Sequence, residues 1–528
     1  MLSFAAQSND KRTSMNKEHT GSDLDGIAPS IYTRRWKILA TLCISLLVVM
    51  IANSSMNLAL PTLARELRLS SLQLTWIVDI YVLVFASLLF TASAVADRYG
   101  RKLVMQLGLL FFLVGTVYAG FFASTGIEVI ISRAIMGIGG AMVMPTTLSI
   151  INNVFPRGER ARAIAIWSGI SGAGIAFGSI VSGFLLEHFS WQSVFIFGAV
   201  VGVIGFMFNQ MLTPESVDEQ KTPVDWLGGA LSIVALLGIV YGIIEAPSHG
   251  LLEPDVLSAF IIGFTALAGF IVWQYKTTHP MLDMKLFKNA SFSVAALAVT
   301  LAFFALMGVF FSMSQLFQLV MGYGAMESSI KMLPLMIVMI VVSPFVPNIV
   351  AKIGARRTVG SGLLIVASGF VLMSLWPVIP SYLQVLGAMS LMMFGMALTM
   401  TPATNIMMAS VPRNRAGMGS AMNDTTRELG GAIGIAVLGA MLASVYSDKV
   451  LDAVKVLPAQ TQDIVQNSLA GALEVAARMG EMGEPLAYAA KAAWMDGLSS
   501  AMVIAAVIVS LAAVVVFRWL PNEAQDAQ

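Results

Sequence analysis

The chain has 528 residues, of which 57% are hydrophobic and 12% are charged, and its formal net charge is +1. A soluble domain carries about a quarter charged residues, so this composition excludes an ordinary water-soluble protein. Most Lys and Arg lie in short segments between apolar runs, which argues against a nucleic-acid partner. Cys43 is the only cysteine, which excludes an internal disulfide, and the four histidines are too scattered to form a metal site.

The first part of the chain, residues 1–35, is polar and lacks periodicity, so we expect a disordered segment in which Met1 and Met15 are both candidate start residues. The apolar run from Ile38 to about Leu58 is longer than the ~7–15 residues of a signal-peptide core. It is therefore expected to remain in the chain as the first membrane span.

Runs of about 20 apolar residues cross a bilayer as helices, whereas barrel strands alternate over about ten residues. The apolar runs predict an all-α membrane protein with spans near 38–58, 73–96, 103–122, 127–153, 163–186, 192–212, 226–246, 256–275, 292–320, 328–350, 358–378, 383–409, 419–446 and 496–519. We expect a six-helix bundle over 36–212, a linker with two inserted helices over 213–291, a second six-helix bundle over 292–519, and a tail over 520–528.

A short charged turn, Ala96–Lys102, separates the second and third spans, and a weaker counterpart, Ala351–Arg357, separates the tenth and eleventh. The Asp97 carboxylate is expected to pair with a neighbouring helix end. Ser93–Lys102 resembles the loop motif Gly-x-Leu-Ala-Asp-Arg-x-Gly-Arg-Lys of the major facilitator superfamily. The resemblance implies a conformational gate formed by Asp97, Arg98, Gly100 and Arg101. Because the two turns are eight spans apart instead of six, spans seven and eight are interpreted as an insertion between two homologous halves.

Cations gather at one side of the predicted membrane. That side would carry Arg34, Arg35, Lys37, Arg98, Arg101, Lys102, Arg157, Arg160, Arg162, Lys352, Arg356, Arg357, Arg413 and Arg415, against Arg65, Arg68, Lys449, Lys455, Arg478 and Lys491 on the other. The positive-inside rule then predicts a multi-pass inner-membrane protein with both termini in the cytoplasm. Residues 447–495 are too polar to span and predict an external loop with a short helical hairpin, which either covers the outer mouth or is a plain surface loop.

The fourth span carries Arg133, followed by a glycine-rich stretch that resembles a span 4 motif of the superfamily, and Pro145 is expected to kink this helix. Ionisable residues inside spans are functional candidates by default, so Arg133 is predicted to line the substrate cavity. The alternative is a structural arginine satisfied by backbone carbonyls.

The first span resembles the signature Asp-x-Thr-x-x-Asn-x-Ala-Leu-Pro of fourteen-span drug exporters, matching at Asn57, Ala59, Leu60 and Pro61. Ala52 stands where the signature has Asp, which weakens the case for dicationic substrates. Asn53 and Asn57 are predicted to line the cavity, although an amide binds no proton.

Asp79, in the second span, belongs to the string Trp76–Tyr81, which resembles that of the quaternary-ammonium exporters. It is a candidate for proton coupling or cation attraction, for pairing with Arg133, or for a solvated carboxylate at a helix end. In the fifth span Gly174, Gly178 and Gly183 resemble an antiporter motif, with Ser179 in place of its proline. These glycines are expected to allow close helix packing.

The thirteenth span begins with the charged residues Asp424, Arg427 and Glu428. A spacing of four puts the two acids on one helix face about 6 Å apart, and Arg427 can reach Asp424. We expect Asp424 to stay charged beside Arg427, which also lines the cavity, and Glu428 to lie deeper and load protons. A purely structural acid–arginine cluster is the alternative.

Taken with Pro280–Phe287, Gln318–Tyr323 and Pro334, these motifs resemble the fourteen-span drug:proton antiporter subfamily over nearly the whole chain. The resemblance implies a major facilitator fold and a monomer in the bilayer. It also implies proton-coupled efflux of amphiphilic toxic compounds, lipophilic cations such as quaternary ammonium compounds among them. Export of a single metabolite or antibiotic, or proton-coupled import, are the alternatives. The sequence has no phosphate-binding loop and no nucleophile with its base, so neither a cofactor nor enzyme activity is expected.

Overall fold

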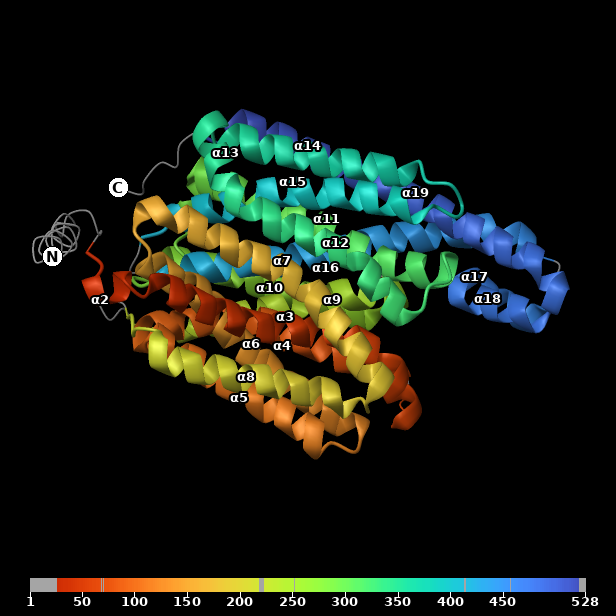
Figure 1. Cartoon of the computed structure of the whole chain (residues 1–528), viewed down its shortest axis with the longest axis horizontal. Coiled ribbons are helices and arrows are strands. Elements are labelled where there is room, and N and C mark those ends of the chain that lie inside the picture. The colour runs from red at the N-terminus through yellow and green to blue at the C-terminus, as the bar shows by residue number, and fades with distance from the viewer. Residues whose placement is uncertain are drawn as a thin grey trace, which may run out of the picture.

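A computed structural model describes residues 26–67, 69, 71–217, 223–250, 252–412, 415–455 and 457–521. The expectations for residues 1–25, Arg68, Arg413 and the tail beyond residue 521 lie outside the described residues, as does the side chain of Asn57. Long helices run along the length of the molecule, and both ends of the chain lie at the same end of it (Figure 1).

The N-terminal bundle and the inserted pair have the expected order of helices. They comprise α2 (Pro29–Tyr32), α3 (Arg35–Glu66), α4 (Ser71–Tyr99), α5 (Arg101–Phe121), α6 (Gly126–Val154), α7 (Arg157–His188), α8 (Gln192–Leu212), α9 (Trp226–His249) and α10 (Pro254–Lys276). The short helix α2 lies in a segment that was expected to be disordered. It is held because Ile31 packs on the bundle core and Arg35, just beyond it, donates from Nη2 to Glu159 at 2.9 Å.

The C-terminal half also follows the expected order, with several interruptions. It comprises η1 (Met284–Lys288), α11 (Ala290–Gln315), η2 (Leu316–Val320), α12 (Ala325–Val342), η3 (Ser343–Phe345), α13 (Val346–Ile353), α14 (Ala355–Ser374), α15 (Tyr382–Ala409), α16 (Ala416–Val454), α17 (Ala459–Asn467), α18 (Leu469–Arg478), η5 (Gly480–Gly483) and α19 (Glu484–Trp519). The tenth span is divided between α12 and α13 because Pro344 and Pro347 cannot donate backbone hydrogen bonds.

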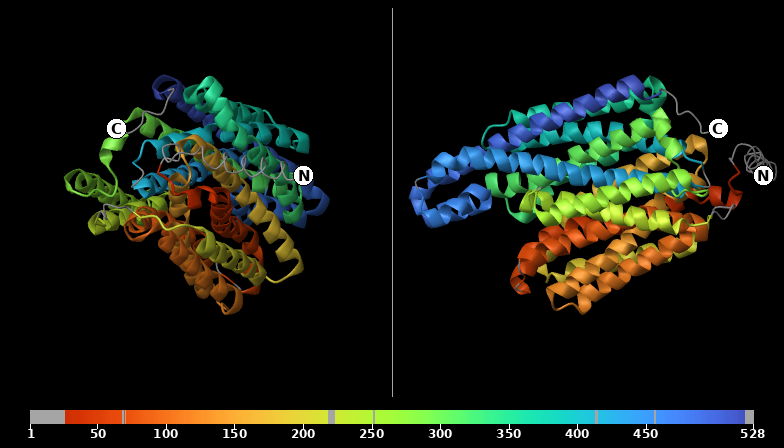
Figure 2. Two further views of the ribbon diagram at one scale, coloured as in Figure 1. Left: turned by 60° about the vertical axis from the view of Figure 1, so that its left-hand side comes forward. Right: turned by 180° about the vertical axis from the view of Figure 1, so that it is seen from behind.

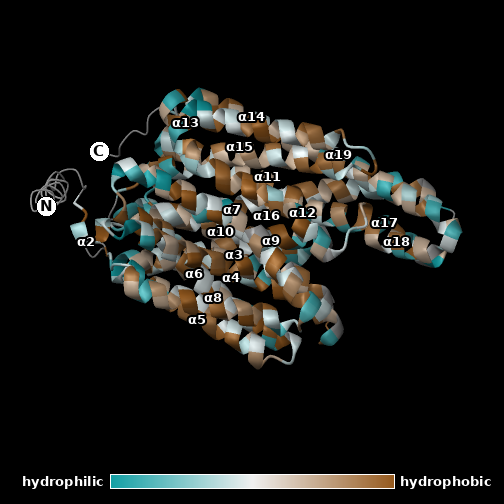
Figure 3. Cartoon of the chain, viewed as in Figure 1, coloured by the Kyte–Doolittle hydropathy of each residue, from teal (hydrophilic) through white to brown (hydrophobic). Residues whose placement is uncertain are grey.

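Thirteen of the described helices or helix runs are long and apolar enough to cross a membrane, judged by length and composition. The helix α7, the fifth of the fourteen expected spans, is not among these thirteen. Its 32 residues extend about 48 Å at 1.5 Å per residue, which is ample for a bilayer. Charged residues in its first two turns and many glycines and serines make it less apolar than the others. Hydrophobic residues accordingly cover the middle of the molecule and hydrophilic ones its ends (Figure 3).

The sequence predicted an external loop over 447–495, whereas most of this segment is helical. α16 continues to Val454 and α19 already begins at Glu484, so both helices project past the other spans. Between them α17 and α18 lie side by side at the far end from the termini (Figure 1). Leu469, Ala472 and Ala476 are the buried residues of α18, and this apolar face explains why a polar segment is ordered as helices.

The two bundles meet on two sides: α4 and α6 pack against α16, and α7 packs against α12 and α15. The inserted helix α9 packs against both α4 and α16, while α10 packs on α9 and is the least buried of the candidate spans. At the end that carries the termini the bundles lie close together, and toward the other end their helices diverge (Figure 2). The insertion thus lies beside one of the two contacts between the bundles.

Candidate functional site

Asp424 of α16 lies at the centre of the molecule with no exposed surface. Its Oδ1 accepts a hydrogen bond from the side-chain amide of Asn423 at 3.2 Å, whereas its Oδ2 has no partner among the described residues. Asn423 is itself held by α15, because the Thr404 hydroxyl donates to its side-chain oxygen at 3.0 Å. One carboxylate oxygen is therefore positioned and the other is uncommitted.

Arg427 extends from α16 into the N-terminal bundle. Its Nη1 donates to the Ser171 hydroxyl at 3.3 Å, and its guanidinium carbon lies 4.7 Å from the ring centre of Trp167 and 5.2 Å from that of Phe303. We call Arg427, Ser171, Trp167 and Phe303 the Arg427 cluster. Trp167 is fixed in turn, since its Nε1 donates to the Thr147 hydroxyl at 3.1 Å. The cluster joins helices of both bundles.

The expected ion pair between Arg427 and Asp424 is not formed within the described residues. Arg427 interacts instead with two aromatic faces and a hydroxyl from other helices, a set of contacts that a buried guanidinium can prefer over a neighbour on its own helix. Its Nε and Nη2 have no hydrogen-bond partner there. The centre of the protein thus contains free donors beside a free carboxylate oxygen.

The two acids differ in exposure. Glu428 is partly exposed, whereas Asp424 is fully buried. Four residues turn a helix by about 40° beyond a full revolution, and this offset directs Glu428 toward α4, within electrostatic range of Tyr81. Next to it, Leu429 packs against residues of α4 and α9.

Arg133 is buried inside the N-terminal bundle, where it binds backbone carbonyls. Its Nε donates to Ile77 at 3.0 Å, and its Nη1 donates to Ala52 at 3.1 Å. The guanidinium also lies 4.3 Å from the ring centre of Tyr81. A small cleft within this bundle, about 270 Å³ with its open mouth included, adjoins it. These contacts agree with the structural alternative for Arg133 rather than with a position between the bundles.

Of the alternatives for Asp79, the pairing with Arg133 is not formed among the described residues. Asp79 is partly exposed and lies within electrostatic range of Glu245 on the inserted helix α9. Nearby, Trp76 and Tyr241 approach each other with ring centres 6.4 Å apart, so α4 and α9 share an acidic and aromatic contact. Asn53 is partly buried and makes no hydrogen bond through its side chain within the described part of the chain.

Tyr81 was missed by the sequence analysis. Its side chain is 1% exposed, stacks on Phe85 with ring centres 5.9 Å apart, and lies between Arg133 and the region of Glu428. Its hydroxyl has no hydrogen-bond partner among the described residues. The available signal was its place in the Trp76–Tyr81 string, two residues after Asp79.

The charged turn joins the two bundles at the end that carries the termini. Arg101 donates from Nη2 to the Asp97 carboxylate at 2.7 Å, and the backbone N–H of Gly417, in the first turn of α16, donates to it at 3.3 Å. This is the contact with a helix end that the sequence predicted. Gly100 has a φ of +121°, which favours glycine. Arg98, in contrast, has no ion pair within the described residues.

Glu215, in the linker, is a second residue that the sequence analysis missed. Its carboxylate accepts from the backbone N–H groups of Lys102 at 3.0 Å and Leu103 at 3.3 Å, at the start of α5. The N–H of Arg101 donates to the Ser216 carbonyl at 2.9 Å. The linker therefore caps the helix that follows the charged turn.

The glycines of α7 allow close packing on both sides. A Cβ atom at Gly174 would lie 2.9 Å from Cβ of Met50, and one at Gly178 would lie 2.8 Å from Cα of Ile51, both on α3. At Gly183 it would lie 3.3 Å from Sδ of Met326 on α12. Pro145 lies within the continuous helix α6 and is buried.

The comparisons with known proteins agree with this architecture. A family model described as Major Facilitator Superfamily matches residues 42–435. The chain belongs to the major facilitator superfamily. It is a transporter and not an enzyme.

Similar sequences include named efflux proteins. The transporter is 34% identical to the multidrug efflux pump LfrA of Mycolicibacterium smegmatis, over 92% of this chain and 96% of LfrA. It is 30% identical to the methyl viologen resistance protein SmvA of Salmonella typhimurium, over 78% of this chain and 84% of SmvA. It is 27% identical to the tetracenomycin C resistance and export protein of Streptomyces glaucescens, over 92% of each. The transporter is therefore related to pumps for toxic compounds.

Solved structures agree in fold. The human organic anion transporter MFSD10 has a TM-score of 0.60 at 12% identity and covers 93% of this chain and 100% of its own. A bacterial homologue of the lysosomal transporter Spinster has a TM-score of 0.57 at 19% identity, covering 95% of this chain and 99% of its own. Identities this low show the shared fold alone.

Proposed function

We propose that this transporter exports amphiphilic toxic compounds across the cytoplasmic membrane in exchange for protons, by alternating access of its two bundles. The observation that carries the proposal is the Arg427 cluster together with Asp424. A buried carboxylate with one uncommitted oxygen lies one helical turn from a guanidinium that reaches across to the other bundle. A proton on Asp424 would change the charge next to that bridge.

The coupling follows from the cost of burying charge. An ionised carboxylate without a full set of partners is expensive in an apolar interior, so its proton affinity depends on what surrounds it. When the bundles rock, the contact of Arg427 with Ser171 and Trp167 breaks, and the environment of Asp424 changes with it. Glu428, partly exposed toward α4, provides the second carboxylate through which the proton leaves or enters.

Substrates would bind where the Arg427 cluster separates. Trp167 and Phe303 supply aromatic faces, and Asp424 and Glu428 supply negative charge, which suits a lipophilic cation. The related SmvA is named for resistance to methyl viologen. We further propose the inner membrane as its location and a cytoplasmic position for both termini, in keeping with the cations grouped at that end.

A second candidate is the dedicated export of one neutral aromatic compound rich in hydrogen-bond acceptors. The uncommitted Nε and Nη2 donors of Arg427 favour it, as does Ala52 in place of an acid. A relative named for tetracenomycin C export points the same way. A susceptibility panel of cationic, zwitterionic and neutral toxicants in an exporter-deficient host separates the two: protection limited to one neutral compound rejects the multidrug-cation proposal.

Coupling is tested in everted vesicles by the ability of an exported substrate to dissipate a pH gradient. Asp424→Asn and Glu428→Gln, singly and together, are compared with Glu481→Gln, an exposed acid of η5 far from the cluster. We expect Asp424→Asn to reduce substrate-induced proton release by at least about tenfold and Glu481→Gln to leave it unchanged. Wild-type release in the double variant would place coupling elsewhere, with Asp79 as the next candidate.

A further inference from the structure

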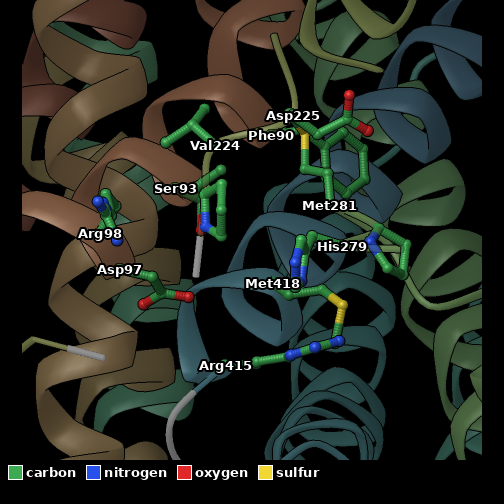
Figure 4. Close-up of a pocket in the computed structure, with 13 residues that line it drawn as sticks. Phe90, Ser93, Asp97, Arg98, Val224, Asp225, His279, Met281, Arg415 and Met418 are labelled. Atoms are coloured by element: carbon green, nitrogen blue, oxygen red, sulfur yellow. The ribbon is translucent and has the colours of Figure 1, made fainter. Parts of the chain in front are cut away.

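A solvent-open cavity lies at the end of the molecule that carries the termini, and its volume is about 520 Å³ with its mouth included. Four parts of the fold form its walls: α4, the end of the linker before α9, the segment after α10, and the first turn of α16 (Figure 4). The N-terminal bundle, the insertion and the C-terminal bundle therefore all contribute. None of the transport residues proposed above, Asp424, Arg427 and Glu428, lines it.

The acidic groups of this cavity are already satisfied. Asp97 binds Arg101 and the N–H of Gly417. Asp225 accepts three hydrogen bonds, from the N–H of Gly228 at 2.8 Å, Nε1 of Trp273 at 2.9 Å and the side-chain amide of Gln274 at 2.8 Å. Both carboxylates are thus used to hold the protein together.

The basic side chains of this cavity, in contrast, have no bonding partners among the described residues. Arg98 on α4, His279 after α10 and Arg415 before α16 line the cavity, and within the described chain none of their side chains has a hydrogen bond or an ion pair. In Figure 4 the side chain of Arg415 extends below the ring of His279 on the side of the cavity opposite Asp97. Among the described residues, two uncommitted guanidinium groups and one uncommitted imidazole therefore come from three separate walls.

The remaining lining is apolar. Phe90, Met281 and Met418 are each at most 8% exposed and form an apolar wall beside these basic side chains. Phe90 also contacts Phe270 of α10, with ring centres 6.4 Å apart, and α10 is the least buried of the candidate spans. The cavity consequently lies next to a helix that faces the lipid.

We propose that this cavity binds the head group of an anionic phospholipid. Arginine side chains match the geometry of a phosphate, so Arg98 and Arg415 would bind it from two sides. One acyl chain would follow Phe90 and Met281 toward α10. Because Arg98 belongs to the N-terminal bundle and Arg415 adjoins α16, the lipid would bridge the bundles next to the contact between Asp97 and Gly417.

A ligand that bridges both bundles binds better when they are close at that end, so it shifts the population toward this state. Anionic lipid would therefore stabilise the arrangement in which the charged turn touches α16. This inference does not depend on the substrate or on the proton coupling proposed above, and it can hold or fail separately from them.

The test uses the full chain in nanodiscs of phosphatidylcholine, with or without phosphatidylglycerol. Spin labels at Gly158→Cys in α7 and Ala351→Cys in α13, both exposed at that end, report the distance between bundles in a Cys43→Ser background. Native mass spectrometry counts retained phosphatidylglycerol. We expect phosphatidylglycerol to enlarge the short-distance population, and Arg415→Gln with His279→Gln to weaken its apparent affinity about tenfold or more, as loss of charge-assisted bonds predicts.

Arg357→Gln is the matched control, because Arg357 is an exposed cation at the same end but outside the cavity. It should behave as the wild type. An equal loss in Arg357→Gln would mean a general surface charge effect and overturn the proposal. The proposal would also be overturned if the wild-type protein responded to glycerol phosphate as it does to the lipid, because the occupant would then be a soluble anion. Identical distance distributions in the two lipid mixtures would reject it outright.

Discussion

Single residues in this transporter take their partners from helices that are distant in sequence. Arg427 is three residues after Asp424, yet its contacts are Ser171, Trp167 and Phe303. Helical spacing identified which residues share a face but gave no information on which neighbouring helix covers it. The acids and the arginine of α16 were therefore predictable as candidates, whereas the aromatic half of the cluster was not.

Arg133 leads to a prediction about stability. It ties α6 to backbone carbonyls of Ile77 and Ala52 on two other helices, so Arg133→Met should lose about 2 kcal/mol of stability, the value of a charge-assisted hydrogen bond. Thermal unfolding of the purified protein measures this. Arg357→Met, at an exposed position in the first turn of α14, is the comparison and should unfold near the wild-type temperature. An unchanged midpoint with lost transport would instead assign Arg133 to the substrate cavity.

At the scale of helices, apolar runs and proline positions predicted most of the elements, because length and hydrophobicity alone decide what crosses a bilayer. The ends of the helices and their packing partners were harder to predict from the sequence. α16 extends eight residues past the expected end at 446, since its apolar face continues to bury Val450 and Val454. In a lipid-embedded bundle, residues that face lipid and residues that face other helices are both hydrophobic, so periodicity does not tell them apart.

Gly178 allows a prediction about helix packing. An alanine there would place Cβ against Ser54 and 2.8 Å from Cα of Ile51, so α7 has to move away from α3. Gly178→Ala should cost about 1–3 kcal/mol and reduce transport at equal expression. Gly158→Ala is the control in the same helix, because its Cβ would meet nothing within 4 Å. Normal unfolding and transport in Gly178→Ala would show that α7 and α3 can separate enough to accommodate a methyl group at little cost in stability.

At the scale of the whole molecule, the sequence predicted two halves and an insertion but not where the insertion packs. The contact of α9 with both α4 and α16 depends on surfaces that are hydrophobic along their whole length. Likewise, the charged turn was recognisable as a candidate gate. Its capping by Glu215 was not, because 113 residues separate Glu215 from Lys102.

Asp97 provides a prediction about the conformational equilibrium. Asp97→Asn replaces the charged acceptor of the Gly417 N–H with a neutral, weaker one and removes the ion pair with Arg101 that positions it, so the bundles should separate more readily at that end. A loss of about 1.4 kcal/mol shifts such an equilibrium tenfold. We expect transport to fall by a similar factor while membrane insertion is unchanged, with Asp255→Asn at the start of α10 as the control. Wild-type transport rates in Asp97→Asn would leave the turn with a topological role only.

Orientation in the membrane is tested by labelling with an impermeant thiol reagent in intact cells. Cysteines at Gly158 in α7 and at Met482 in η5, the latter 79% exposed, lie at opposite ends of the molecule. The proposed orientation predicts reaction at Met482→Cys and protection at Gly158→Cys, with the buried Cys43 replaced by serine. The reverse pattern would invert the proposed topology.

The cap that Glu215 places on α5 also decides where the two inserted helices are joined to the rest of the protein. Since residues 215 and 216 are bonded to the first turn of α5, the part of the chain that is fixed to the N-terminal bundle extends to Ser216 and does not stop at Leu212, where α8 ends. The charged turn and the start of the inserted pair therefore share one point of attachment to the N-terminal bundle, the first turn of α5.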